Sequence, residues 1–180
     1  MGDRHAHIRL AVAALHADAH TEVLRLSRLV WSRGVGAAKG PFLNGVVRLR
    51  THHGALGLLR LCKAIERRLG RQPARRWGDR TIDLDVLLWH DEAIQLPQLT
   101  VPHAQMLLRA FVVVPAREVG GDLVHPQLRR PVSELPVPRG MRVWSASGVG
   151  GRLAGLRRVR YCPAPASAAV DRLDHLGDSP

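Results

Sequence analysis

The stretch that decides the fold reads Arg76-Trp77-Gly78-Asp79-Arg80-Thr81-Ile82-Asp83-Leu84-Asp85. From residue 82 onward, an apolar residue occupies every second position, which predicts a β-strand over residues 81–89. Side chains two positions apart on a strand project from the same face, about 6 to 7 Å apart at their bases. We therefore expect Asp83 and Asp85 to lie side by side.

Two neighbouring carboxylates suit hard cations, because Mg²⁺ takes oxygen ligands and is commonly held by one or two carboxylates together with substrate phosphates. The sequence before the pair is basic, with Arg71, Arg75, Arg76 and Arg80. Guanidinium groups present paired donors to phosphate oxygens, and phosphoryl transfer relies on such cations and on metal ions. The alternative interpretations are a solvated strand face and a water-exposed basic loop.

The composition is that of one soluble domain. The chain has 180 residues, of which 46% are hydrophobic and 23% charged, enough for a single core. Two of its 27 basic residues are lysine, which leaves 25 arginines, and the formal charge is +12. Polyphosphate and nucleic acid both fit this charge, although a high-GC coding sequence would also enrich arginine.

The same sequence excludes several classes of protein. No apolar run approaches the roughly 18 residues of a membrane-spanning helix, and the N-terminus is polar, so we predict a cytoplasmic protein without a membrane anchor. Cys62 and Cys162 lie in very different surroundings, which argues against a disulfide framework or a zinc cluster.

The rest of the chain shows further regular elements. Residues 3–17 and 58–69 are expected to be helices, with Asp3 and Gly70 as their respective caps. The other expected elements are strands over residues 22–32, 42–50 and 93–96, and a helix over residues 105–119 that breaks at Pro115. We predict one domain over residues 1–135 and a largely disordered Pro/Gly/Ala/Arg-rich tail over residues 136–180.

Several separated motifs occur in a specific order. They are Pro41-Phe42-Leu43-Asn44-Gly45, Glu66 with Gly70-Arg71, residues 76–85, Leu99-Thr100-Val101-Pro102-His103, and Arg109-Ala110-Phe111. This order resembles the signature of the hydroxymethyldihydropterin pyrophosphokinase family, over roughly residues 2–135. The resemblance implies a ferredoxin-like α+β sandwich with a mainly antiparallel sheet.

The resemblance also implies a reaction. ATP would transfer its two terminal phosphates as one unit to 6-hydroxymethyl-7,8-dihydropterin, which gives the pterin diphosphate and AMP in folate biosynthesis. Two Mg²⁺ ions would bridge the phosphates and lower the pKa of the attacking hydroxyl. ATP and the pterin would be the partners, and functional pairing with other folate-pathway enzymes is a further expectation.

Many of the family's functional roles fall on residues of this chain. The implied catalytic residues are Asp83, Asp85 and Arg80, and the two aspartates would also be the metal ligands. The implied ATP-binding residues are Glu66, Arg71, Arg75, Trp77, Arg80, His103 and Arg109. The implied pterin-binding residues are Phe42, Asn44 and Phe111. Each assignment has a structural alternative. The phenylalanines could pack in the core, His103 could have a capping or surface role, and Glu66 could occupy a solvated helix position.

The match departs from the family pattern at its start. The family begins with a strand that leads into Gly-Ser-Asn-Leu-Gly-Asp-Arg, whereas this sequence starts at Met1-Gly2-Asp3-Arg4, so we expect the first strand to be missing and its neighbours to keep unpaired backbone groups. An upstream start codon and a decayed copy would both explain this. The alternatives to the enzyme are a truncated pseudoenzyme with residual nucleotide binding and a basic nucleic-acid-binding protein; nucleic acid is disfavoured because the sequence has no recognised binding motif.

Overall fold

The structure is a computed structural model that describes residues 3–33, 41–70, 82–139 and 143–146. The helices are α1 (Arg4–His16), α2 (Ala55–Arg68), α3 (Ala110–Gly120) and the short 3-10 helices η1 (Met106–Leu108) and η2 (Val132–Glu134). The strands are β1 (Thr21–Leu26), β2 (Val30–Arg33), β3 (Pro41–Asn44), β4 (Val47–Thr51), β5 (Ile94–Leu96), β6 (Leu99–Val101), β7 (Val124–His125), β8 (Arg130–Pro131) and β9 (Val143–Ser145).

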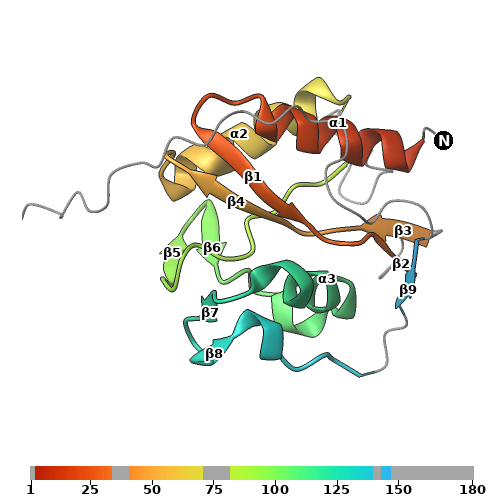
Figure 1. Ribbon diagram of the computed structural model, residues 1–180. Helices are drawn as coiled ribbons and strands as arrows, with labels where there is room; N and C mark the ends of the chain where they lie inside the picture. The colour runs from red at the N-terminus through yellow and green to blue at the C-terminus, as the bar shows by residue number, and fades with distance from the viewer. Residues whose placement is uncertain (1–2, 34–40, 71–81, 140–142, 147–180) are drawn as a thin grey trace, which may run out of the picture.

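The elements form layers around the long strand pair β1–β4. Helices α1 and α2 cover one face of this pair, and α3 lies on its opposite side with β7 and β8 (Figure 1). The strand pairs among the described residues are antiparallel. This arrangement confirms the predicted α+β class with its antiparallel sheet.

Helix α1 begins where the sequence predicts. The Asp3 side chain accepts a hydrogen bond from the Ala6 N–H at 3.1 Å, which caps the first turn. The buried face of the helix carries Val12 and Leu15, which pack against Val23 of β1. Local capping and the apolar stripe therefore specify the same helix.

Helix α2 is confirmed and starts three residues before the expected range, at Ala55. Its buried stripe includes Leu58, Cys62 and Ile65. The helix ends at Arg68, and Gly70 follows with a φ of 88°, a left-handed conformation that glycine adopts without strain.

The two strands expected over residues 22–32 and 42–50 are each divided into two. Between the halves, the Ser27 hydroxyl accepts a hydrogen bond from the Val46 N–H at 2.9 Å, and the Ser27 N–H donates to the Val46 carbonyl at 2.9 Å. Gly45 lies at this bend, where a Cβ atom would come within 2.6 Å of the Leu29 side chain. The chain therefore turns from the β1–β4 pair into the β3–β2–β9 sheet, which a continuous alternation in the sequence does not reveal.

The prediction of a helix over residues 105–119 with a break at Pro115 is wrong in its details. The interruption lies at Arg109, between η1 and α3, and Pro115 lies inside α3. Proline has no N–H to donate, which weakens a helix interior. Helix α3 nevertheless continues through it because Val113, Ala116 and Val119 are buried on its inner face.

The strand predicted over residues 81–89 is absent from the part of it that the structure describes. Residues 82–88 belong to no helix or strand, and Trp89 makes an isolated bridge to Glu92. The backbone groups of this segment bond elsewhere: the Leu84 N–H donates to Glu66, and the Leu87 carbonyl accepts from the His103 N–H. More buried and less buried residues still alternate along residues 82–86, although this segment has no partner strand among the described residues.

Part of the predicted tail joins the sheet. Strand β9 pairs antiparallel with β2, with Trp144 opposite Trp31, so these residues of the tail are ordered. The division into a domain over residues 1–135 and a tail stays a prediction, because most of residues 140–180 lie outside the described residues. Among the residues described, none of the helices combines the length and the apolar character that are needed to cross a bilayer.

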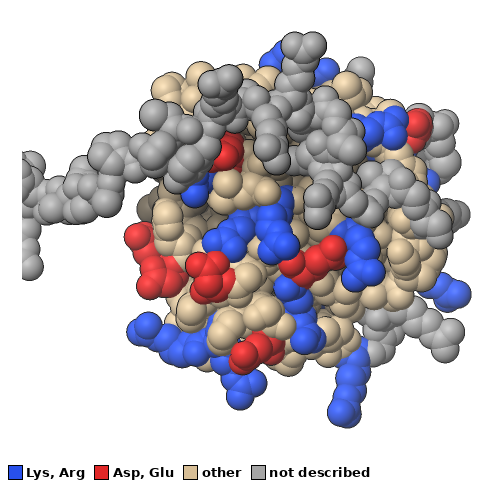
Figure 2. Space-filling model, in the orientation of Figure 1, with Lys and Arg blue, Asp and Glu red and all other residues tan. Residues whose placement is uncertain are grey.

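Charged side chains of both signs are interspersed on the face of the molecule shown in Figure 2. Three pairs among the described residues, Arg28–Glu118, Arg48–Asp122 and Arg50–Glu22, approach within 3.4, 2.8 and 3.1 Å. The described residues on this face therefore do not form the single-sign basic surface that a phosphate backbone would favour.

Candidate active site

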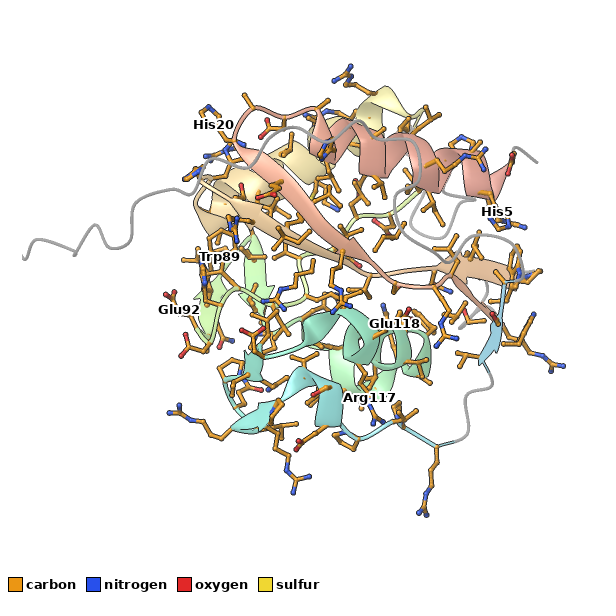
Figure 3. The ribbon with its side chains drawn as sticks, in the orientation of Figure 1. His5, His20, Trp89, Glu92, Arg117 and Glu118 are labelled. Atoms are coloured by element: carbon orange, nitrogen blue, oxygen red, sulfur yellow. The ribbon has the colours of Figure 1, made fainter. Side chains whose placement is uncertain are left out.

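The two aspartates predicted to bind metal lie on the segment that follows residue 81. The side chains of Asp83 and Asp85 are 39% and 43% exposed, whereas Val86 is buried and Leu84 partly buried. This alternation fits the prediction that the carboxylates share one side of an extended segment. The segment ends at the turn that carries Trp89 and Glu92 (Figure 3).

Two side chains of α2 hold the backbone between the aspartates. Glu66 Oε1 accepts hydrogen bonds from the Leu84 N–H at 2.6 Å and from Lys63 Nζ at 2.8 Å. Lys63 Nζ also donates to the Leu84 carbonyl at 3.3 Å and lies 3.8 Å from Asp83 Oδ1. The Glu66 side chain is fully buried, so the alternative of a solvated helix position is wrong.

His103 approaches Asp85 from the segment after β6. Its Nδ1 atom accepts a hydrogen bond from the Gln105 N–H at 3.2 Å, which in the neutral ring places the proton on Nε2. That Nε2 atom lies 4.0 Å from Asp85 Oδ2. In this tautomer the Nε2–H of His103 lies on the side of the ring that is near the Asp85 carboxylate.

An open pocket of about 280 Å³ adjoins Asp85 and His103. Leu59, Val86 and Leu99 give it apolar walls, while the polar groups that line it belong to Lys63, Asp85, Gln98, Thr100 and His103. A pocket that combines apolar walls with several polar groups can accept a small molecule that has both apolar and polar parts.

A second group of predicted residues lies on the β2–β3 pair. Phe42 is opposite Ser32 and Asn44 is opposite Val30, so these residues share one face of the sheet. The Asn44 amide nitrogen donates to the Ser32 hydroxyl at 3.0 Å and to the Phe42 carbonyl at 3.1 Å. Phe42 is 37% exposed, which gives a flat ring access to it. Core packing is therefore an incomplete account of Phe42.

Arg109 and Phe111 come together at the start of α3. The Arg109 guanidinium lies over the Phe111 ring, 5.7 Å from its centroid, and also donates a hydrogen bond to the Gln105 side chain. Phe111 is partly buried, so one part of its ring remains accessible. The structure thus places a predicted phosphate-binding cation directly beside a predicted pterin-binding ring.

The remaining predicted site residues, Arg71, Arg75, Trp77 and Arg80, lie outside the described residues.

The described residues fit a divalent cation that is shared with a substrate. They contain no cluster of three or more His, Cys, Asp or Glu side chains that could hold a metal by themselves. Mg²⁺ does not need such a cluster, because one or two carboxylates together with nucleotide phosphates and water complete its six ligands. Asp83 and Asp85 are accessible donors of this type, and Asp85 also lines the pocket.

Comparison with known proteins decides the family. The sequence model of the 7,8-dihydro-6-hydroxymethylpterin-pyrophosphokinase (HPPK) family matches residues 1–121. The chain belongs to the HPPK family. Among its relatives, an enzyme of Bacillus subtilis is 38% identical over 151 residues, which cover 83% of this chain and 88% of that one. It is named 2-amino-4-hydroxy-6-hydroxymethyldihydropteridine pyrophosphokinase.

Other HPPK relatives carry the same name. The protein of Pseudomonas aeruginosa is 41% identical over 123 residues, which cover 68% of this chain and 76% of that protein. The protein of Aquifex aeolicus is 35% identical over 136 residues, which cover 75% of this chain and 84% of the relative.

Sequence reasoning missed two side chains that contact the predicted site residues. The helical pattern places Lys63 on a polar face, although the lysine contacts Glu66, Leu84 and Asp83. Its spacing of three residues from Glu66 is the signal that could have indicated their pairing. Ser32 is buried, and its bond to Asn44 depends on a strand register that a single sequence does not show.

Proposed function

We propose that this HPPK family member catalyses ATP-dependent pyrophosphoryl transfer to 6-hydroxymethyl-7,8-dihydropterin in folate biosynthesis. One observation carries the proposal: in a chain that is 38% identical to a pyrophosphokinase over most of its length, the pocket is lined by Asp85, two residues from the accessible Asp83. The reaction forms a bond between the hydroxymethyl oxygen and the β-phosphorus of ATP. It breaks the bond from that phosphorus to the bridging oxygen, which leaves with AMP, and the hydroxyl proton is released.

The described residues divide the work of this reaction. The apolar walls of the pocket hold the nucleotide base, and His103 directs its N–H toward a phosphate oxygen. Phe42 and Phe111 stack on the pterin ring, while Asn44 bonds its polar edge. Arg109, held over Phe111, places a positive charge where the phosphates and the pterin meet.

Asp83 and Asp85 would hold Mg²⁺, two ions in the arrangement we propose. Bound there, the metal neutralises charge on the phosphate oxygens and favours the alkoxide character of the attacking group. Glu66 acts on the nucleotide site indirectly, because its buried carboxylate accepts a hydrogen bond from the Leu84 N–H between the two aspartates. The proposed ATP site also includes four residues that are assigned from the sequence alone: Arg71, Arg75, Trp77 and Arg80. The cytoplasmic location and the pairing with other folate-pathway enzymes also stay predictions.

Chromatography of the nucleotides tests the proposal. The purified protein is incubated with ATP and Mg²⁺, with and without the reduced pterin. We expect AMP only when the pterin is present, in an amount equal to the pterin diphosphate. Binding of ATP without formation of AMP would instead support the truncated pseudoenzyme. Salt-sensitive retention on DNA without nucleotide preference would support the basic nucleic-acid-binding protein.

A further inference from the structure

Lys63 links α2 to the segment that carries both proposed metal ligands. Its side chain is 35% exposed and reaches three acceptors: Glu66 Oε1 at 2.8 Å, the Leu84 carbonyl at 3.3 Å and Asp83 Oδ1 at 3.8 Å. The motifs that identify the site do not include this lysine. Its contacts nevertheless converge on the residues between and beside the two aspartates.

The contacts fix the backbone of Leu84 from two directions. The Leu84 N–H donates to Glu66 at 2.6 Å, and the Leu84 carbonyl accepts from Lys63. These side-chain bonds occur where a strand neighbour would otherwise supply backbone partners. Asp83 and Asp85 flank Leu84, so the orientation of this one residue sets the direction in which both carboxylates leave the chain.

Lys63 also carries a charge of the same sign as a metal ion. An ammonium group near Asp83 attracts that carboxylate and repels a divalent cation bound to it. Its removal would leave the buried Glu66 carboxylate, which makes the surroundings of the aspartates more negative. The lysine therefore improves the geometry of the carboxylates while it weakens their affinity for the metal.

We propose that Lys63 is a positioning residue for pyrophosphoryl transfer, which holds Leu84 so that Asp83 and Asp85 meet the nucleotide-bound metal in the productive orientation. This inference rests on the proposed function. It predicts that turnover and metal affinity respond to the loss of Lys63 in opposite directions. Loss of a side chain that only stabilises the fold would not lower turnover and raise metal affinity at the same time.

The test uses Lys63→Met, which keeps an unbranched stem and removes both the charge and the donor. We expect kcat to fall about tenfold or more while KM for ATP changes less than about threefold. Mn²⁺ binding with a non-hydrolysable ATP analogue, followed by the electron paramagnetic resonance of free Mn²⁺, should tighten by about threefold or more. Arg60→Met is the matched control, because Arg60 is an exposed cation one turn away on α2, and neither quantity should change.

A second variant separates the two effects. Lys63→Gln removes the charge but keeps an N–H donor for the Leu84 carbonyl, so Mn²⁺ binding should tighten while kcat stays closer to that of the wild type. Lower kcat with unchanged or weaker Mn²⁺ binding in folded Lys63→Met overturns the inference, and so does unchanged kcat. A wild-type protein that forms no AMP overturns the proposed function instead, and the Mn²⁺ titrations then still test the effect of Lys63 on the metal site.

Discussion

Glu66 lies between Ile65 and Arg67 on a helix whose outer face is strongly basic, and it is nevertheless fully buried. A carboxylate is costly to remove from water unless it is paired and hydrogen-bonded. Lys63 and the Leu84 N–H supply such partners here. The family motif pointed to this residue, but only the contacts show that it binds the backbone of the segment that carries Asp83 and Asp85.

Replacement of Glu66 by alanine should therefore destabilise the protein strongly. The change leaves the Lys63 ammonium and the Leu84 N–H without this acceptor, for which we expect a loss of about 3 kcal/mol in the free energy of unfolding. Urea denaturation followed by circular dichroism measures it. Glu22→Ala removes an exposed carboxylate paired with Arg50 and should cost less than about 1 kcal/mol. Equal losses in the two variants would contradict this account of Glu66.

Phe42 is the residue on which the pterin site can be tested most simply. Its ring is accessible at the edge strand β3, so Phe42→Ala should raise KM for the pterin about tenfold, with KM for ATP unchanged, because stacking on the pterin is lost. Steady-state kinetics at saturating ATP measure the change. Leu43→Ala alters the opposite face of the same strand and serves as the control. A rise in KM for ATP alone would assign Phe42 to the nucleotide instead.

At the scale of elements, helices α1 and α2 could be predicted from the sequence, whereas the strand predicted over residues 81–89 does not form in the part that the structure describes. Helices α1 and α2 are specified locally, by Asp3 at one N-terminus, Gly70 after one C-terminus and a continuous apolar stripe. A strand needs a partner as well as a pattern. Residues 82–88 have the alternation, but their backbone groups bond to Glu66, Lys63 and His103.

The residues of the candidate site also differ in whether the sequence alone could predict them. Residue types and their order in the sequence predict Asp83, Asp85, His103 and Phe42 as site residues, because a motif can be read from the linear sequence. The contacts of Lys63 and Ser32 depend on how separate elements pack and pair, so they follow from the structure alone.

The bend between β3 and β4 gives a prediction at this scale. Gly45→Ala would place a Cβ atom 2.6 Å from the Leu29 side chain, which is almost completely buried, so we expect a loss of about 1 to 3 kcal/mol in the free energy of unfolding. Chemical denaturation measures this loss. Gly54→Ala is the control, since a Cβ atom there would meet no neighbour within 4 Å and the change should be within about 0.5 kcal/mol. Equal stability of the two variants would show that the bend tolerates a side chain.

At the scale of the whole molecule, composition and motifs predicted the α+β class, and the layers around β1–β4 confirm it. Composition predicted less about the surface. A formal charge of +12 does not show where the charges lie, and acidic side chains lie among the basic ones on the face in Figure 2. Charge placement depends on the fold, which a sum over the sequence does not contain.

The buried His125 gives the global stability a pH dependence. Burial lowers the pKa of this ring from its ordinary value of 6.5, because the charged form is poorly solvated there. The unfolded state therefore takes up the proton first as the pH falls through 6.5, and stability present above that pH is lost toward acid. Unfolding free energies between pH 8 and pH 5 should fall less steeply in His125→Gln than in the wild type. The exposed His52→Gln is the control, and an identical slope in His125→Gln would remove His125 as the cause.

The central claim is that Asp83 and Asp85 together hold the metal that the nucleotide needs for pyrophosphoryl transfer. The most direct measurement is the rate of AMP formation from ATP and the pterin by Asp83→Asn and Asp85→Asn, with Asp91→Asn as an exposed control two residues beyond Trp89. We predict that each of the first two variants, folded as judged by circular dichroism, loses about 100-fold or more of kcat, while the control keeps it. Wild-type turnover in either Asp83→Asn or Asp85→Asn would contradict the account.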